Sequence, residues 1–187
     1  LLPVNPVFIW FSLLVAFLLN LLPWGRWAGM PDLLAVALVF WNVHQPRRVG
    51  VGAAFVFGLF MDVHQGALLG QHALAYTLLS FFAITVHRRL LWFTVPSQAA
   101  QILPLFAAAH AVSLLVRLMA GAAFPGWTLF IAPVLESALW PLASIVLLGN
   151  LLFLLNLSAA IVSYYRLVCK TAYADATAQL EPVGVKP

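Results

Sequence analysis

The chain has 187 residues, of which 64% are hydrophobic and only 7% are charged, and its mean hydropathy is +1.03. So few polar groups cannot cover the surface of a water-soluble domain, and the sequence predicts an integral membrane protein. The net charge of +4 is then explained by contact with the anionic lipid of a bilayer, and no nucleic-acid binding is expected.

Apolar runs follow one another along the chain, and each is expected to form one of about six transmembrane helices. They cover about residues 7–22, 31–43, 49–62, 73–86, 96–120 and 128–148. The second to fourth runs are shorter than the ~20 residues of a straight span, which favours short helices in a compact bundle. No period-two alternation indicates a barrel, so the predicted fold is all-α.

A single transmembrane domain is expected over residues 1–168, followed by a disordered cytoplasmic tail over residues 169–187. The basic residues predict the orientation of this domain. They gather in the second and fourth connections and after the last run, as Arg47, Arg48, Arg88, Arg89, Arg166 and Lys170. Because Lys and Arg accumulate on the cytoplasmic side, we expect both termini in the cytoplasm and the connection near residues 62–72 outside.

The segment GLFMDVHQGALLGQHALAY (58–76) places a carboxylate, two histidines and three glycines at the end of an apolar run. It could form a metal site, a catalytic site or a turn. Zinc needs three or four convergent ligands, but Asp62 and His64 are two residues apart on different helix faces, and His72 lies beyond the glycines. No metal or cofactor is expected. The glycines predict a turn at which Asp62 and the histidines meet water, and Asp62 can also cap a helix or hold a backbone amide.

Motifs of intramembrane enzymes, such as H-E-x-x-H, G-x-S-G and G-x-G-D, do not occur in the sequence. The acidic residues are scattered along the chain, whereas acid–base and nucleophilic catalysis need partners within about 3 Å of each other. An enzyme is therefore not expected.

Glu136 is the most costly side chain to place in a membrane, because a carboxylate inside a span costs about 2.5 to 3.5 kcal/mol. In a hairpin of the fifth and sixth spans, Arg117 and Glu136 reach similar depths, so their side chains are predicted to pair. His110, Ser113 and Arg117 share one helix face. This stripe could be a polar seam, an ion path or a buried network, and the structural network is favoured for a protein that is not an enzyme.

Two further patterns concern helix packing. Gly50, Ala54 and Gly58 recur at intervals of four, which lets another helix approach closely. Packing within the bundle is favoured over an interface with a partner. Pro141, directly after Trp140, removes a backbone donor and is expected to kink the sixth span.

Taken together and in this order, five segments resemble the MreD family of rod shape-determining proteins from bacterial inner membranes. They are MPDLLAVALVFW (30–41), PRRVGVGAAFVFGLFMD (46–62), GALLGQHALAY (66–76), HRRLLWF (87–93) and ESALWPL (136–142). The resemblance covers about residues 1–147. The positions that match the family motif are Pro31, Asp32, Arg48, Gly50, Gly58, Asp62, Gly70, Trp140 and Pro141.

The resemblance implies a non-enzymatic six-span scaffold of the cell-elongation machinery in the cytoplasmic (inner) membrane. It also implies a bundle similar to the substrate-binding subunits of energy-coupling-factor transporters. The implied partners are MreC, the RodA glycosyltransferase, a class B penicillin-binding protein and the MreB filament, and the implied task is support of lateral peptidoglycan synthesis. The chain departs from the family after the W-P motif, because residues 142–168 stay apolar and are long for one span.

Two other classes of protein remain open. A solute-binding transporter subunit would need an enclosed polar pocket, for which His110, Arg117 and Glu136 are the candidate lining. A membrane enzyme acting on a lipid-linked precursor would need a base and an electrophile together at one interface, with Asp62 or His64 as the candidates.

Overall fold

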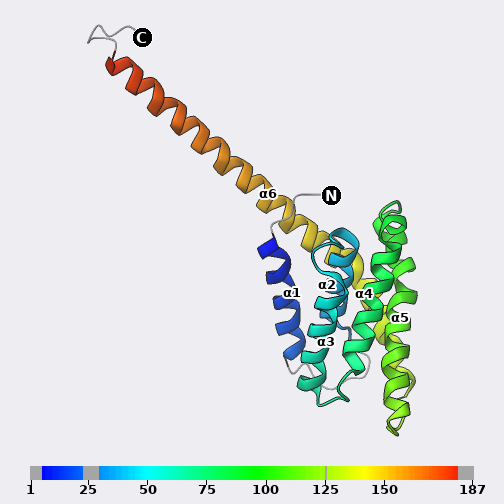
Figure 1. Cartoon of the computed structure of the whole chain (residues 1–187). Helices are drawn as coiled ribbons and strands as arrows, with labels where there is room; N and C mark the ends of the chain where they lie inside the picture. Colours follow the sequence, from blue (N-terminus) through cyan, green and yellow to red (C-terminus); the bar gives the residue numbers. More distant parts are fainter. Residues whose placement is uncertain (1–5, 23–29, 125, 181–187) are drawn as a thin grey trace. The chain divides into compact units, whose positions relative to one another are not determined.

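The computed structural model describes residues 6–22, 30–124 and 126–180, and these residues form helices joined by turns, without a β-strand. In chain order the elements are α1 (Pro6–Leu21), α2 (Leu33–His44), α3 (Gly50–Gln65), α4 (Gln71–Leu90), α5 (Val95–Met119), the short 3-10 helix η1 (Trp127–Phe130) and α6 (Ile131–Leu180) (Figure 1). The prediction of an all-α fold is confirmed.

Each predicted apolar run corresponds to a helix of the structure, but the first and last residues of the helices differ from the predicted bounds. Helix α3 continues to Gln65, so Asp62 and His64 lie in its last turns and not in the connection. The connection itself covers residues 66–70, where Gly66 and Gly70 have positive φ angles of 60° and 103°. Such left-handed backbone is accessible to glycine at little cost, so these two residues permit the tight reversal between α3 and α4.

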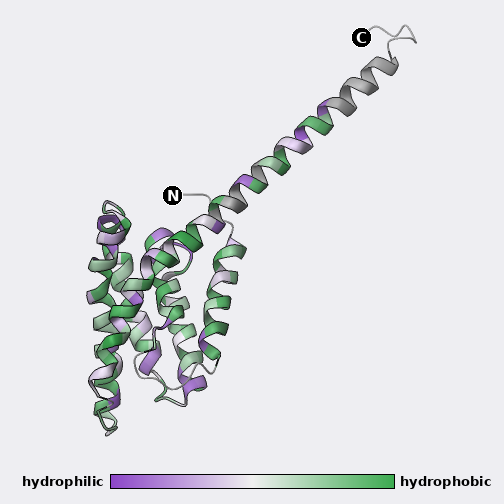
Figure 2. Ribbon diagram, turned by 180° about the vertical axis from the view of Figure 1, so that it is seen from behind, coloured by the Kyte–Doolittle hydropathy of each residue, from purple (hydrophilic) through white to green (hydrophobic). Residues whose placement is uncertain are grey.

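The lengths and compositions of the helices fit a membrane protein. Among the described residues, two stretches are long and apolar enough to cross a bilayer, Val95–Met119 and Trp127–Asn150, and α1 and α2 are shorter apolar helices. Figure 2 shows hydrophobic residues along all of these helices. Several large apolar side chains are exposed, which is unfavourable in water but is expected against lipid.

The chain divides into two compact units, Leu1–Ile145 and Val146–Pro187. The first unit holds α1 to α5, η1 and the first part of α6, and the rest of α6 belongs to the second unit. Helix α6 is assigned as far as Leu180, and residues 181–187 lie outside the described residues. The boundary expected at residue 168 stays a prediction.

Helix α2 lies in the core of the first unit. Every residue from Leu34 to Val43 is buried, as expected of a helix that is apolar on all sides and enclosed by others. Its Trp41 indole donates to the Ser12 hydroxyl of α1 at 2.8 Å. On another side, Phe40 contacts the fully buried Trp140 of α6, with ring centroids 6.0 Å apart. The short helix α2 is therefore the central helix of the first unit, enclosed by its neighbours.

Helices α3 and α4 form a tight hairpin, and Gly58 sets their separation. A Cβ atom at Gly58 would lie 2.4 Å from the Ala73 Cα atom and 2.6 Å from the Ala73 nitrogen. Both are backbone atoms, which cannot rotate away as a flexible side chain can. The small-residue stripe therefore packs inside the unit at Gly58, whereas Gly50, at the beginning of α3, has open space around its Cα.

Gly58→Ala should separate the two helices and lower the free energy of unfolding by about 1 to 3 kcal/mol, as overpacking does elsewhere. The matched control is Gly52→Ala in the same helix, where a Cβ atom meets nothing within 4 Å. That change should be neutral or stabilise the protein by up to about 1 kcal/mol through helix propensity. Thermal unfolding of the detergent-purified variants measures both, and equal stabilities would contradict the assigned role of Gly58.

Candidate functional site

Two hydrogen-bonded networks hold the acidic side chains among the described residues of the first unit. One surrounds the carboxylate of Asp62, and the other surrounds the carboxylates of Asp32 and Glu136. Asp62 and Glu136 are 1% and 0% exposed, which is rare for acidic residues unless hydrogen bonds compensate for the lost water. The hydrogen-bond partners of the three carboxylates therefore show which helices each network connects.

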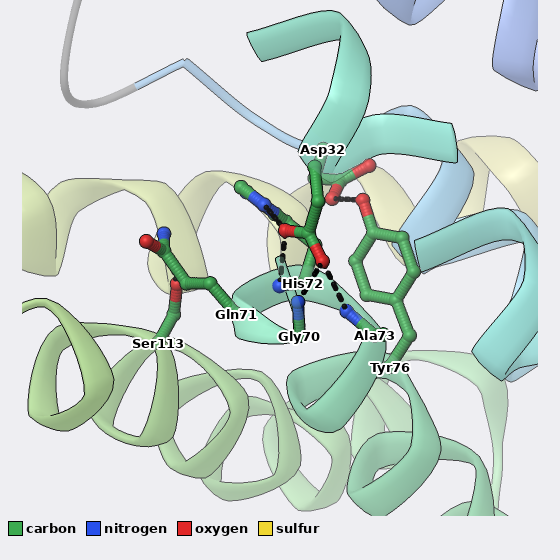
Figure 3. Close-up of polar contacts among 8 residues, drawn as sticks. Asp32, Gly70, Gln71, His72, Ala73, Tyr76 and Ser113 are labelled. Atoms are coloured by element: carbon green, nitrogen blue, oxygen red, sulfur yellow. Dashed lines mark hydrogen bonds and ion pairs between the residues drawn. The ribbon is translucent and has the colours of Figure 1, made fainter. Parts of the chain in front are cut away.

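Asp62 binds the amino-terminal end of α4. Its carboxylate accepts hydrogen bonds from the backbone N–H groups of Gly70 at 2.8 Å, His72 at 2.7 Å and Ala73 at 3.3 Å (Figure 3). The first N–H groups of a helix have no partner within the helix, and Gly70, the residue preceding α4, has no side chain to offer one. A carboxylate on the neighbouring helix thus supplies the cap.

The ring of His72 adds a fourth hydrogen bond to the same carboxylate, with Nδ1 2.8 Å from Oδ1. The expectation that Asp62 meets water is wrong, because these four donors replace the water and allow burial. Its expected role as a cap that holds backbone amides agrees with the structure. His64, which is two residues away on a different face of α3, is exposed.

Asp32 precedes α2 and caps it, with Oδ1 accepting the N–H of Ala35 at 3.0 Å. The same carboxylate accepts a hydrogen bond from the side chain of Asn20 in α1 at 2.5 Å. It also accepts one from the hydroxyl of Tyr76 in α4 (Figure 3). Asn20 also accepts the N–H of Leu33 at 3.2 Å. One carboxylate therefore joins the end of α1, the start of α2 and the first turns of α4.

Glu136 of α6 joins this second network through the backbone. Its Oε1 accepts the N–H of Asp32 at 3.0 Å and lies 3.5 Å from Nε2 of His110 in α5, while its Oε2 has no hydrogen-bond partner. The other ring nitrogen of His110 lies 3.1 Å from the Phe106 carbonyl oxygen, so this nitrogen must donate. A neutral His110 would then turn a lone pair toward Glu136. The two groups attract only when one proton lies between them.

The predicted pair of Arg117 with Glu136 is wrong, because the ion pair that Glu136 makes among the described residues is with His110. Glu136 therefore meets α5 about two helical turns before Arg117, and the depth assumed for the pair was not the one in the structure. Ser113, on the same face of α5 as His110, accepts a hydrogen bond from Gln71 of α4 at 2.9 Å (Figure 3). The polar stripe of α5 is thus divided between α6 and α4.

The remaining residues of the family motif lie outside these hydrogen bonds. Pro31 precedes Asp32, Arg48 is exposed in the turn after α2, and Trp140 donates its indole N–H to the buried Gln98 at 3.2 Å. Pro141 lies within α6, and its kink stays a prediction. Among the described residues, no three His, Cys, Asp or Glu side chains are arranged to hold a metal ion.

Sequence reasoning singled out Asp32, Asp62 and Glu136 but missed Tyr76, Asn20 and Gln71. A buried tyrosine hydroxyl usually has a hydrogen-bond partner, so Tyr76 in an apolar helix was a signal that could have been used. Asn20 and Gln71 gave no such signal, because each is a polar residue near a helix end, where solvent is the ordinary partner.

Two comparisons with known proteins show which family this sequence resembles. The sequence model of the family "rod shape-determining protein MreD" matches residues 3–158. The rod shape-determining protein MreD of Haemophilus influenzae is 28% identical over 142 residues, which cover 71% of this chain and 85% of that protein. No solved structure gives a significant match.

Asp62→Ala should leave three backbone amides and one ring N–H without an acceptor, at a cost of at least about 2 kcal/mol in the free energy of unfolding. The amides of Gly70, His72 and Ala73 should also exchange hydrogen faster. His64→Ala, in the same helix but exposed, is the matched control and should change stability by less than about 0.5 kcal/mol. Unchanged exchange at residues 70–73 in Asp62→Ala would contradict the capping role.

A double-mutant cycle tests which basic residue Glu136 contacts. Glu136→Gln keeps an acceptor for the Asp32 amide, and combined with His110→Leu it should show a coupling of about 0.5 to 3 kcal/mol. The parallel cycle of Glu136→Gln with Arg117→Met should be additive within about 0.5 kcal/mol. Thermal unfolding in detergent gives both values, and coupling in the Arg117 cycle alone would restore the pair that we reject.

Proposed function

The chain belongs to the MreD family of rod shape-determining proteins, and we propose that it acts as a non-enzymatic membrane scaffold of the cell-elongation machinery. In this proposal it binds MreC and thereby supports lateral peptidoglycan synthesis by RodA and a class B penicillin-binding protein, beside MreB filaments. It crosses the cytoplasmic membrane six times with both termini in the cytoplasm. Its bundle is similar to that of the substrate-binding subunits of energy-coupling-factor transporters.

The observation that best supports a scaffold function is that the carboxylates of Asp32 and Asp62 are occupied by hydrogen bonds within the protein. A catalytic carboxylate must be free to accept or donate a proton at a reacting atom. Here each of the two carboxylates accepts at least three hydrogen bonds and caps a helix. Such groups fix the positions of helices relative to one another, which is what a protein acting through contacts with partners requires.

The distribution of charge supports the proposed orientation. Asp32 and Asp62 lie where α2 begins and α3 ends. Four exposed arginines lie at the opposite end of the unit: Arg47 and Arg48 in the turn after α2, and Arg88 and Arg89 in the last turn of α4. Positive charge in short loops favours the cytoplasmic side, so the turn between α3 and α4 is proposed to face outward.

This outward turn is the surface that we propose for contact with MreC. Leu68 and Leu69 are 48% and 74% exposed. The backbone on both sides of them is held, since Gly66 ends α3 and the Gly70 amide bonds to Asp62. Apolar side chains on a fixed backbone lose little entropy when they bind, which makes them effective anchors.

The solute-binding alternative has less support. Of the three side chains expected to line its pocket, His110 and Glu136 contact each other, and Arg117 is not part of that contact. Two hollows of the first unit are open at the surface and are lined by other residues. Saturable binding of a small ligand to the pure protein would nevertheless favour this alternative.

Leu69→Ser should weaken the contact with MreC by about tenfold, the loss expected when roughly 1.4 kcal/mol of apolar burial is removed. Affinity purification from membranes that contain tagged chain and MreC measures the amount of MreC recovered. His64→Ala, exposed near the same end, is the control and should leave recovery unchanged. Absence of MreC with the unchanged chain would refute the proposed function, whereas equal recovery with Leu69→Ser would refute only the surface.

A further inference from the structure

The turn between α4 and α5 forms a surface hollow of about 510 Å³. It is lined by Arg88 and Arg89 from the last turn of α4 and by Trp92 and Phe93 from the connection. Trp92 is 90% exposed, and both arginines are exposed as well. Two guanidinium groups and two aromatic rings thus meet around one open space.

The backbone of this hollow is fixed by hydrogen bonds. The N–H groups of Leu91, Trp92 and Phe93 donate to the carbonyl oxygens of His87, Arg89 and Leu90 at 3.1 to 3.3 Å. The carbonyl oxygen of Phe93 accepts a further hydrogen bond from the Gln98 side chain at 2.9 Å. Gln98 is 8% exposed and is itself held by the Trp140 indole. The backbone that carries the lining side chains is therefore held in place before any ligand binds.

Positive charge in the hollow has no protein counter-charge. The ion pairs among the described residues involve Asp62 and Glu136, and neither includes Arg88 or Arg89. Helix α5 begins directly after the hollow, and no side chain caps its first turn, so the positive end of its dipole lies beside the negative end of the α4 dipole and leaves the charge of the two arginines dominant. An anion would be favoured at this place.

A simpler explanation for Arg88 and Arg89 is that they offset the negative end of the α4 dipole. That role needs only basic residues in the last turn, and it requires neither a hollow nor aromatic walls. Arg47 and Arg48 offer a direct comparison, because they also form an exposed adjacent pair at the same end of the unit but do not line this hollow.

We propose that the hollow binds the phosphate headgroup of an anionic membrane phospholipid. Guanidinium groups bind phosphate oxygens through paired hydrogen bonds, which matches Arg88 and Arg89. Trp92 and Phe93 provide an apolar wall of the kind that residues at a membrane interface present to the glycerol and upper acyl region. Free phosphate could use the arginines but not this wall, so the lipid is the better match.

The test is native mass spectrometry of the protein released from nanodiscs of mixed phosphatidylglycerol and phosphatidylcholine. The unchanged protein should retain phosphatidylglycerol in preference to phosphatidylcholine. Arg88→Gln with Arg89→Gln should reduce this retention at least tenfold, whereas Arg47→Gln with Arg48→Gln should reduce it less than twofold. Trp92→Ala should also reduce it. Thermal unfolding in the absence of lipid checks that each variant is folded, and Arg88→Lys with Arg89→Lys replaces the glutamine pair if that pair does not fold.

Equal losses in the two arginine pairs would overturn the proposal, since they would indicate diffuse electrostatic attraction. Full retention in the Arg88 and Arg89 double variant would overturn it as well. Inorganic phosphate provides a separate arm: if millimolar phosphate displaces the lipid, the site recognises free phosphate and the assignment to lipid fails. None of these outcomes depends on whether MreC binds the chain, so this inference and the proposed function can fail separately.

Discussion

The capping of α4 by the carboxylate of Asp62 is the interaction on which the rest of the first unit depends. It requires α3 and α4 to approach within backbone contact, and Gly58, one helical turn before Asp62, permits that approach. It also requires a tight reversal, which the positive φ angles of Gly66 and Gly70 allow. A carboxylate that accepts hydrogen bonds from four donors can be buried, because these hydrogen bonds replace its hydration. The roles of Gly58, Asp62, Gly66 and Gly70 in this hairpin therefore depend on one another.

Helix α4 transmits this constraint to the other helices. Once its first turn is fixed, Tyr76 lies within reach of Asp32, and the backbone N–H of Asp32 in turn reaches Glu136. The contact of Glu136 with His110 then adds α5. Because every step uses a group that is already held by the previous one, loss of one carboxylate is expected to loosen several helix ends together. A network of this kind gives a small membrane bundle one defined arrangement, which packing of apolar side chains against equally apolar lipid specifies less strongly.

Much of the fold was predictable from hydropathy, since each apolar run became a helix and two glycines of the 58–76 segment, Gly66 and Gly70, became a turn. The site was predictable only in part. Asp62 was recognised as a possible cap, but its burial was not foreseen, because the sequence does not show how many donors converge on one side chain. The pairing of Arg117 with Glu136 failed because the depth of each residue was estimated by assuming a tight hairpin of α5 and α6. His110, which Glu136 contacts, shares the helix face of Arg117 but lies about 10 Å away along the helix axis. The register between the two helices therefore decides which side chains meet.

The two ends of the first unit consequently present different chemistry to their surroundings. The carboxylates are consumed by internal hydrogen bonds, so among the described residues of this unit the exposed charged side chains are four arginines at one end. At the other end the held turn offers exposed leucines, Leu68 and Leu69. A partner that approaches the acidic end is thus met by shape and apolar surface, because the acids there are no longer available for recognition. A ligand at the basic end is met by charge that no protein group neutralises, and the hollow beside Arg88 and Arg89 adds the geometry that charge alone lacks.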